Sequence, residues 1–246
     1  MSGHSHSKKI KHQKEITDQK RGQIFSKLSR VISVAVKERG GSPESNPSLK
    51  LAMEKAKEFN MPKENIERAI KRGTGELEGG KLEEVLFEAY GPGEIAIIIE
   101  GITDNKNRTL GEIKQILSQN NGKLVGEGAV KWIFERKGCI VLDLNKQGEE
   151  FTNKESLEMI AIDLGARDFY WHDDLLDVYT GTDDLDKIKK NLEGRGIKID
   201  SASLDWIAKE GASLSEKDKE TCQKLFEALD ENEAVQGVYS NIKLSI

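Results

Sequence analysis

A glycine-rich segment, Gly73-Thr74-Gly75-Glu76-Leu77-Glu78-Gly79-Gly80, divides the chain into two parts with different hydrophobic patterns. Before it, apolar residues recur at the three- and four-residue spacing of amphipathic helices. After it, they alternate or form short continuous runs, as in strands. The segment itself has too few apolar residues and too many glycines for a regular element. We therefore expect a helical unit, a hinge over residues 73–81, and an α+β body.

The part before the hinge predicts three helices within residues 20–73. The first carries an apolar stripe, widened by Phe25 and Ile32, that consists of Ile24, Leu28, Val31 and Ala35. Asn46-Pro47 supplies an N-cap and a first-turn proline for the second helix, and Pro62 starts the third in the same way. Three amphipathic stripes of this kind can enclose one small core.

The part after the hinge predicts strands at 82–90 and 95–102, a helix ending near Asn121, and a strand at 130–135. In that strand Trp132 is expected in the core rather than as a base-stacking platform. A βαβαβ series follows, and a last helix (215–229) and strand (235–244) close the chain. The ββαβ series of 82–134 lacks the αβ tail that 215–246 would supply. We therefore predict an α+β fold with three domains: residues 1–75, a discontinuous domain of 81–135 plus 209–246, and an inserted acidic domain of 136–208.

The N-terminal residues combine dense positive charge with the first helix. Residues 1–75 hold 17 Lys and Arg against 8 Asp and Glu, whereas the remainder holds 21 against 35, out of 38 and 43 in the whole chain. A basic end on an acidic body attracts a polyanion in one orientation. Charge runs are also commonly solvated faces without a partner. If the charge is functional, the expected contacts are an arm (Lys8, Lys9, Lys11, His12 and Lys14) and a helix (Lys20, Arg21, Lys27, Arg30 and Lys37), with Lys20, Lys27, Arg30 and Lys37 forming a solvent-facing ridge.

A second candidate lies at the start of the helix that follows the 95–102 strand. Asn107 is the expected N-cap, so Lys106 and Arg108 would flank the positive end of the helix dipole, which favours an anion. The alternative is an ordinary cap with solvent-facing bases.

Several functional classes find no support in the sequence. Cys139 and Cys222 are far apart and outside any CxxC pair, so neither a disulfide nor a metal site is expected. His172 is the only histidine outside the arm, and no catalytic triad spacing occurs. No apolar run approaches the ~20 residues of a membrane span. These features predict a cytoplasmic, non-enzymatic monomer without metal, cofactor or membrane contact.

Several motifs together resemble the YebC/PmpR family, to which a mitochondrial translational activator of cytochrome oxidase is also similar. They lie in order along the chain: Gly3-His4-Ser5, Ile10-Lys11-His12, Lys20-Arg21-Gly22, Asn60-Met61-Pro62-Lys63, Asn65 to Ile70, Thr103 to Thr109, and Trp132 to Gly138. The family usually reads Lys-Trp after the first motif, where this chain has His6-Ser7. The resemblance implies a helical domain followed by two α+β domains and no enzymatic activity.

The charge pattern and the resemblance together indicate a nucleic-acid-binding regulator of gene expression. Family members are usually described as DNA-binding transcriptional regulators, and some act in translation on the ribosome. The partner expected here is therefore DNA or ribosomal RNA, because phosphate contacts are common to both. The alternative is a protein-binding adaptor whose acidic body meets a basic partner.

Overall fold

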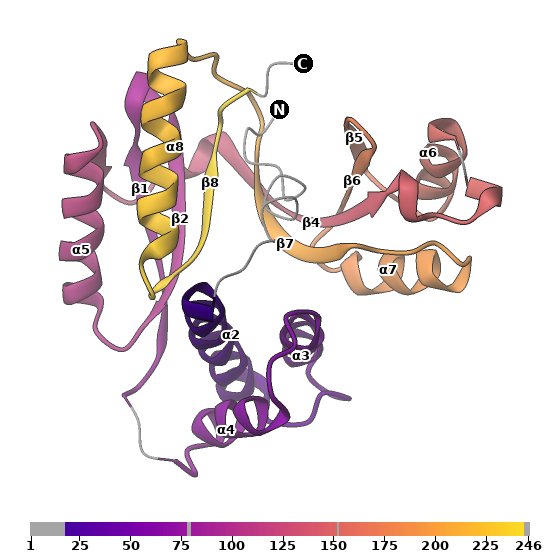
Figure 1. The fold of residues 1–246 in the computed structure, drawn as a ribbon, viewed down its shortest axis with the longest axis horizontal. Coiled ribbons are helices and arrows are strands. Elements are labelled where there is room, and N and C mark those ends of the chain that lie inside the picture. Colours follow the sequence, from indigo (N-terminus) through magenta and orange to yellow (C-terminus); the bar gives the residue numbers. More distant parts are fainter. Residues whose placement is uncertain (1–17, 78–79, 152, 244–246) are drawn as a thin grey trace.

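The computed structural model describes residues 18–77, 80–151 and 153–243 and arranges them as a helical domain beside two open sheets. In Figure 1 the two sheet domains lie side by side, with the helical domain below them. This arrangement confirms the predicted α+β fold class with an N-terminal helical domain.

The helical domain consists of α2 (Asp18–Arg39), α3 (Pro47–Glu58) and α4 (Lys63–Thr74). Buried Asn46 joins the first two helices: its side chain accepts a hydrogen bond from the Leu49 N–H at 3.0 Å and donates to the Ala35 and Gly40 carbonyls at 2.8 Å each. The core is made of apolar residues from all three helices: Leu28, Ile32, Ala35, Val36, Leu49, Ala52, Ala56, Met61, Ile66 and Ala69.

Gly73 permits the close packing of α4 against α2. A Cβ at this position would lie 2.5 Å from the Ser33 carbonyl oxygen and 2.6 Å from the Val36 Cβ. Next to this contact, the buried Ser33 hydroxyl donates to the Ala69 carbonyl at 2.8 Å. The first glycine of the segment that we read as a hinge therefore also serves helix packing.

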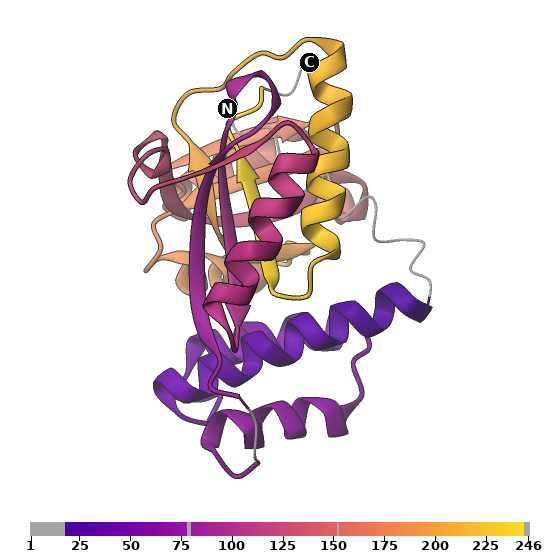
Figure 2. The same ribbon diagram turned by 90° about the vertical axis from the view of Figure 1, so that its left-hand side faces the viewer.

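The first sheet has the order β3-β1-β2-β8, and all its strand pairs are antiparallel. Its strands are β1 (Glu83–Tyr90), β2 (Ala96–Thr103), β3 (Lys123–Val125) and β8 (Val235–Ser240). Helices α5 (Lys106–Gln119) and α8 (Glu216–Glu231) cover one face, as Figure 2 shows. Ile97, Ile113 and Leu225 are fully buried in the core that they enclose.

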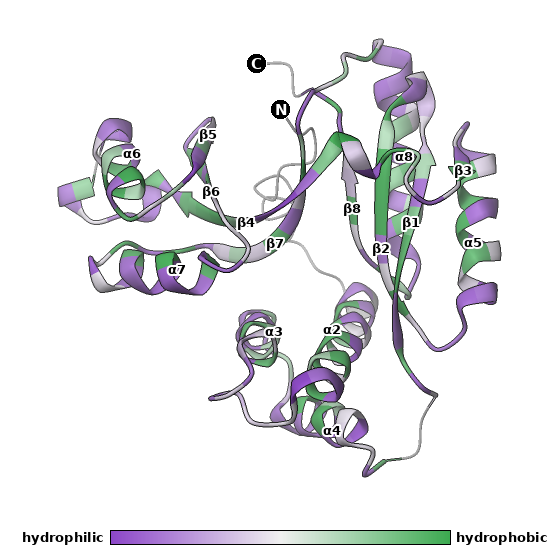
Figure 3. Cartoon of the chain, turned by 180° about the vertical axis from the view of Figure 1, so that it is seen from behind, coloured by the Kyte–Doolittle hydropathy of each residue, from purple (hydrophilic) through white to green (hydrophobic). Residues whose placement is uncertain are grey.

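The second sheet has the order β5-β6-β4-β7. Its strands are β4 (Phe134–Asp143), β5 (Asp168–His172), β6 (Leu175–Thr180) and β7 (Ser201–Ala208). Helices α6 (Lys154–Asp163) and α7 (Leu185–Gly194) pack on one face through Leu157, Leu185 and Ile188. In Figure 3 the central strand β2 is largely hydrophobic, whereas the helices alternate between hydrophobic and hydrophilic residues. This pattern is expected of helices that each bury one side.

The last strand returns to the first sheet, since β8 pairs with β2 from Ile97↔Ser240 onward. The second sheet is formed by the chain between β3 and α8. This confirms that the third domain is inserted in the second. Strands β4 and β7 pair from Phe134↔Ala208 to Val141↔Ser201 and form the connection between the two sheets. The boundaries drawn at 135/136 and 208/209 stay a prediction.

Local expectations were wrong in the region that joins the two sheets. Residues 131–133 form the 3₁₀ turn η3 (Lys131–Ile133) rather than a strand, and β4 runs from Phe134 to Asp143 without a break at the predicted start of the inserted domain. Strand β5 was missed, so the inserted domain has the order βαββαβ. Short 3₁₀ turns also occur at η2 (Pro92–Glu94), η4 (Leu144–Lys146) and η5 (Glu149–Phe151). No helix in the described ranges is long and apolar enough to cross a membrane.

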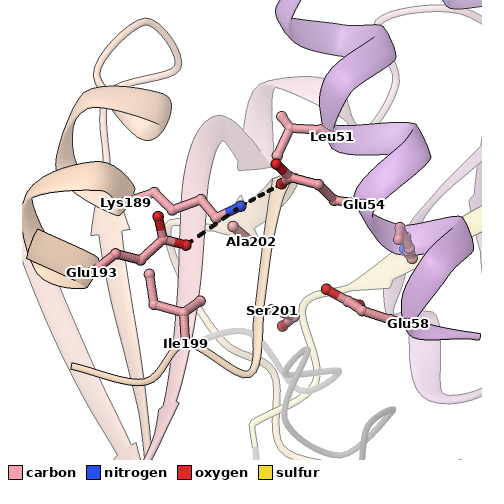
Figure 4. Close-up of a pocket in the computed structure, with 9 residues that line it drawn as sticks. Leu51, Glu54, Glu58, Lys189, Glu193, Ile199, Ser201 and Ala202 are labelled. Atoms are coloured by element: carbon pink, nitrogen blue, oxygen red, sulfur yellow. Dashed lines mark hydrogen bonds and ion pairs between the residues drawn. The ribbon is translucent and has the colours of Figure 1, made fainter. Parts of the chain in front are cut away.

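The helical domain also contacts the inserted domain through α3 and α7. Lys189 Nζ lies 2.5 Å from Glu54 Oε2, and Leu51 packs against the core of the second sheet. Figure 4 shows the small cavity of about 90 Å³ at this contact, lined on the inserted-domain side by residues that include Ile199 and Ser201. The helical domain therefore touches both sheet domains.

Candidate nucleic-acid interface

The predicted contacts fall into groups with different surroundings. The arm residues Lys8, Lys9, Lys11, His12 and Lys14 lie outside the described residues. Lys20 and Arg21 are exposed near the N-terminal end of α2. Both therefore stay candidate contacts on the solvent-exposed surface of the helical domain.

Lys27 and Arg30 face the body of the protein rather than solvent. Lys27 Nζ binds the Asp230 main-chain carbonyl and lies 3.1 Å from Asp230 Oδ1. Arg30 donates to the Ile102 carbonyl and to Glu233 Oε2, both at 3.1 Å. Their side chains are only 14% and 16% exposed. The prediction that they form part of a solvent-facing ridge is wrong, because the side of α2 away from its own core packs on the second domain.

Lys37 occupies an intermediate position. It is exposed, but its Nζ donates to the Leu82 carbonyl at 2.9 Å, just before β1. Together with Lys27 and Arg30 it ties α2 to the body at three places along the helix. Whether these three residues also bind nucleic acid stays a prediction.

The loop before α5 is held by its own side chains. Asn105, not Asn107, is the N-cap, and its Oδ1 accepts from the Arg108 N–H at 3.0 Å. The Arg108 guanidinium lies 2.6 Å from Asp104 Oδ1 and 3.6 Å from Glu112 Oε1. The hydrogen bond from Arg108 keeps the pKa of Asp104 below its usual value, with a smaller contribution from Arg30. The structure thus places both Arg30 and Arg108 close to Asp104. Both guanidinium groups already have partners within the chain: Arg30 binds the Ile102 carbonyl and Glu233, and Arg108 binds Asp104 and Glu112.

Lys106 differs from Arg108 although the two are separated by one residue. Its side chain is exposed, and it forms no ion pair among the residues that the structure describes. It is thus the one of the two loop cations whose charge is available to an external anion near the helix N-terminus.

A group of cations on α4 was missed by the sequence reasoning. Arg68, Lys71 and Arg72 are exposed, and none of them pairs with a carboxylate within the described part of the chain. Their spacing of three and four residues places them on one side of the helix. The spacing is visible in the sequence, but basic residues in the last turn of a helix are also explained by the helix dipole, so the pattern alone does not indicate a ligand.

Trp132 is 68% exposed, so the prediction that it lies in the core is wrong. It sits on η3, in a loop fixed by the buried carboxylate of Glu88, which accepts from the N–H groups of Gly128 (2.6 Å), Val130 (2.7 Å) and Lys131 (2.8 Å). Burial alone would raise the pKa of Glu88, but these N–H donors lower it below its usual value. Val130 and Phe134 fill the core beneath the loop, and Trp132 between them points outward.

Comparison with known proteins identifies the family. Residues 5–76 match the family model described as the TACO1/YebC protein N-terminal domain, and residues 82–242 match the model of the TACO1/YebC second and third domain. The chain belongs to the TACO1/YebC family. The single model for 82–242 covers both sheets together, in accord with an insertion of one sheet domain into the other.

Relatives within the TACO1/YebC family resemble the chain over nearly its whole length. A probable transcriptional regulatory protein of Caldanaerobacter subterraneus is 47% identical over 99% of both chains. One of Halothermothrix orenii is 46% identical over 99% of this chain and 96% of its own. The crystal structure of a conserved hypothetical protein from Aquifex aeolicus, 40% identical, superposes with a TM-score of 0.89 over 98% of each chain. These names support a regulatory role.

The reactive groups of this TACO1/YebC chain are in surroundings that suit structure rather than catalysis. Burial raises the pKa of the Cys139 thiol, and it raises that of Cys222 to about 11. Both thiols are therefore protonated and weakly nucleophilic at neutral pH. His172 Nε2 lies 3.0 Å from the buried Asp177 carboxylate, on the hairpin of β5 and β6. The absence of an enzymatic activity stays a prediction.

Proposed function

We propose that the protein is a non-enzymatic, nucleic-acid-binding regulator of gene expression that uses the helical domain as its main contact with DNA or ribosomal RNA. The observation that carries this proposal is the cluster of exposed cations on α4, Arg68, Lys71 and Arg72, which have no carboxylate partner among the described residues. Cations that remain unpaired on an overall acidic chain are available to phosphates.

The proposal extends the cluster to other cations of the N-terminal 75 residues and to one cation of the α5 loop. The proposed contacts are Lys8, Lys9, Lys11, His12, Lys14, Lys20, Arg21, Arg68, Lys71, Arg72 and Lys106. It assigns Lys27, Arg30, Lys37 and Arg108 to contacts within the chain, because each already binds a carboxylate or carbonyl of the body. The names of the relatives favour DNA, and the resemblance to translation factors favours ribosomal RNA.

The test is the salt dependence of binding by the full chain. Fluorescence anisotropy with a labelled DNA duplex and a labelled single-stranded RNA should show affinity falling by about 10³ to 10⁵ between 50 and 200 mM salt if six to ten phosphates are engaged. The variant R68A/K71A/R72A should weaken binding to every sequence alike and reduce the salt slope.

A matched control removes the same charge from the acidic inserted domain. Lys187, Arg195 and Lys198 are exposed and unpaired in the described ranges, so K187A/R195A/K198A should leave binding unchanged. Equal losses in both variants would show an unspecific effect of net charge. Absence of binding at 50 mM salt would reject the proposal and favour the protein-binding adaptor.

A further inference from the structure

The most exposed large apolar side chain in the described part of the chain is Trp132, on the 3₁₀ turn η3. An indole left in water loses the stabilisation that burial would give, so the exposure of Trp132 calls for a functional explanation. The neighbouring Ile133 and Phe134 pack into the core below. The chain therefore buries the residues next to Trp132 and leaves its largest aromatic ring outside.

The ring is held in place although it is exposed. The Trp132 indole N–H donates to the Ala129 carbonyl at 3.0 Å, and three N–H groups of the same loop bind Glu88. The indole N–H is thus hydrogen-bonded within the loop, and the apolar faces of the ring are exposed to solvent. A ring that is already ordered loses little conformational entropy when a ligand stacks on it.

Two exposed lysines lie next to the loop that carries this ring. Lys209 Nζ donates to the Trp132 carbonyl at 2.9 Å, and Lys131 is its neighbour, with Nζ 5.4 Å from the ring centre of Trp206. Both lysines are exposed, and neither pairs with a carboxylate in the ranges that the structure describes. An exposed indole with two exposed ammonium groups next to its loop resembles a single-stranded nucleic-acid site, in which a base stacks and the adjoining phosphates meet positive charge.

We propose that Trp132 is a stacking platform for one unpaired base of single-stranded nucleic acid, with Lys131 and Lys209 contacting the adjacent phosphates. This inference rests on the proposed function, because it adds a second contact, on the body, to the one on the helical domain. Trp132 also fits a protein hot spot, where Trp is enriched. The two exposed lysines next to the loop favour a polyanion over an apolar protein surface.

The test uses the full chain with labelled oligouridylate and a labelled DNA duplex. W132A should weaken oligouridylate binding by about 5- to 100-fold, since each base stacked on an aromatic ring contributes strongly to single-strand affinity. W132F, which keeps an aromatic face, should lose less. Duplex binding should not change, because paired bases cannot stack on the indole. Trp132 is exposed, so both variants should unfold at the same urea concentration as the wild type.

Tryptophan fluorescence provides a direct readout of stacking. Oligouridylate should quench the wild-type emission, and W132F should lose this quenching. The control is W171F, because Trp171 is half-buried and its indole N–H donates to Glu158 at 2.6 Å. This variant should retain the quenching. K131A/K209A should lower the single-strand salt slope by roughly 0.7 for each lysine.

The outcomes separate this inference from the proposed function. If the wild type binds oligouridylate and W132A binds it equally well, the stacking site is rejected, Trp132 becomes a candidate protein contact, and the proposed function stands. If the wild type binds neither probe, both are rejected. Quenching that persists in W132F would place the stacked base at another tryptophan and would also reject the inference.

Discussion

The cationic side of α2 and the loop around η3 differ in opposite ways from what their sequences suggest. Lys27 and Arg30 keep only 14% and 16% of their side-chain surface exposed, although helical periodicity turns them away from the helical core. Trp132 is 68% exposed, although it shares the two-residue spacing of Val130 and Phe134, which are buried. Periodicity identifies the side of an element that faces its own domain. In a chain of several domains, the opposite side faces either water or another domain.

The same comparison applies to charge. Lys27 and Arg30 bind Asp230 and Glu233 at the C-terminal end of α8, about two hundred residues away in sequence. Lys131 and Lys209 form no ion pair with a carboxylate in the described part of the chain. A basic pattern therefore predicts binding to an anion without deciding whether that anion belongs to the same chain. The following experiments test this distinction, beginning with the largest expected effect.

The largest effect is expected at Glu88, which holds the η3 loop in place. Glu88→Ala leaves three buried or half-buried N–H groups without their acceptor, so the free energy of unfolding should fall by roughly 2–5 kcal/mol. Glu88→Gln keeps one acceptor oxygen and should lose less. Urea unfolding measures both. A loss below 1 kcal/mol in Glu88→Ala would show that the loop does not depend on the carboxylate.

The wild-type stability should also depend on pH through Glu88. The pKa of Glu88 is lower in the folded protein than in the unfolded chain, where it is about 4.3. Its contribution is therefore complete above that value and is lost as the pH falls through the lower folded pKa. The difference in stability between wild type and Glu88→Gln should shrink on acidification over this range, which urea titrations at several pH values can measure.

The fold was more predictable from sequence than the candidate site. The change of hydrophobic period at residues 73–80 predicted the helical domain. The αβ tail that is missing after residue 134 predicted the inserted sheet, because it follows from the order of the elements along the chain. Strand β5 was missed because Asp168–His172 is short and shows no alternation of buried and exposed residues. The environment of Arg30 could not be predicted, since its partner Glu233 is 203 residues away and no local pattern encodes that contact.

A medium effect is expected from Lys27→Ala/Arg30→Ala, the pair that holds α2 on the body. Each contact has an exposed carboxylate partner, so the free energy of unfolding should change by at most about 1 kcal/mol per pair. The helical domain should instead become more mobile, and limited proteolysis within residues 73–81 should be faster than in the wild type. Affinity for nucleic acid should change less than twofold.

The control for this variant removes two charges from the same domain without touching the body. Within the described residues, Lys50 and Lys63 form ion pairs only with Glu54 and Glu67 on their own helices, so Lys50→Ala/Lys63→Ala should leave the proteolysis rate unchanged. A fall of about two units in the salt slope for duplex DNA in Lys27→Ala/Arg30→Ala would instead show that these residues bind phosphates. That result would also support the prediction that the cations of α2 bind nucleic acid.

The smallest effect is expected at the start of α5, where a free cation and a paired one are two residues apart. Arg108 is held by Asp104 and Glu112, whereas Lys106 has no ion pair among the described residues. Lys106→Ala should reduce the duplex salt slope by about 0.9, the value for one phosphate contact. Arg108→Ala should leave the slope unchanged and cost less than about 1 kcal/mol of stability, because the pair is largely solvated.

The effect of Arg108→Ala should instead be seen at Asp104, whose pKa should rise when Arg108 is removed. Carboxyl NMR titration measures that rise. If Arg108→Ala lowers the salt slope as much as Lys106→Ala does, then pairing within the chain does not prevent phosphate binding, and the distinction between the two kinds of cation is wrong.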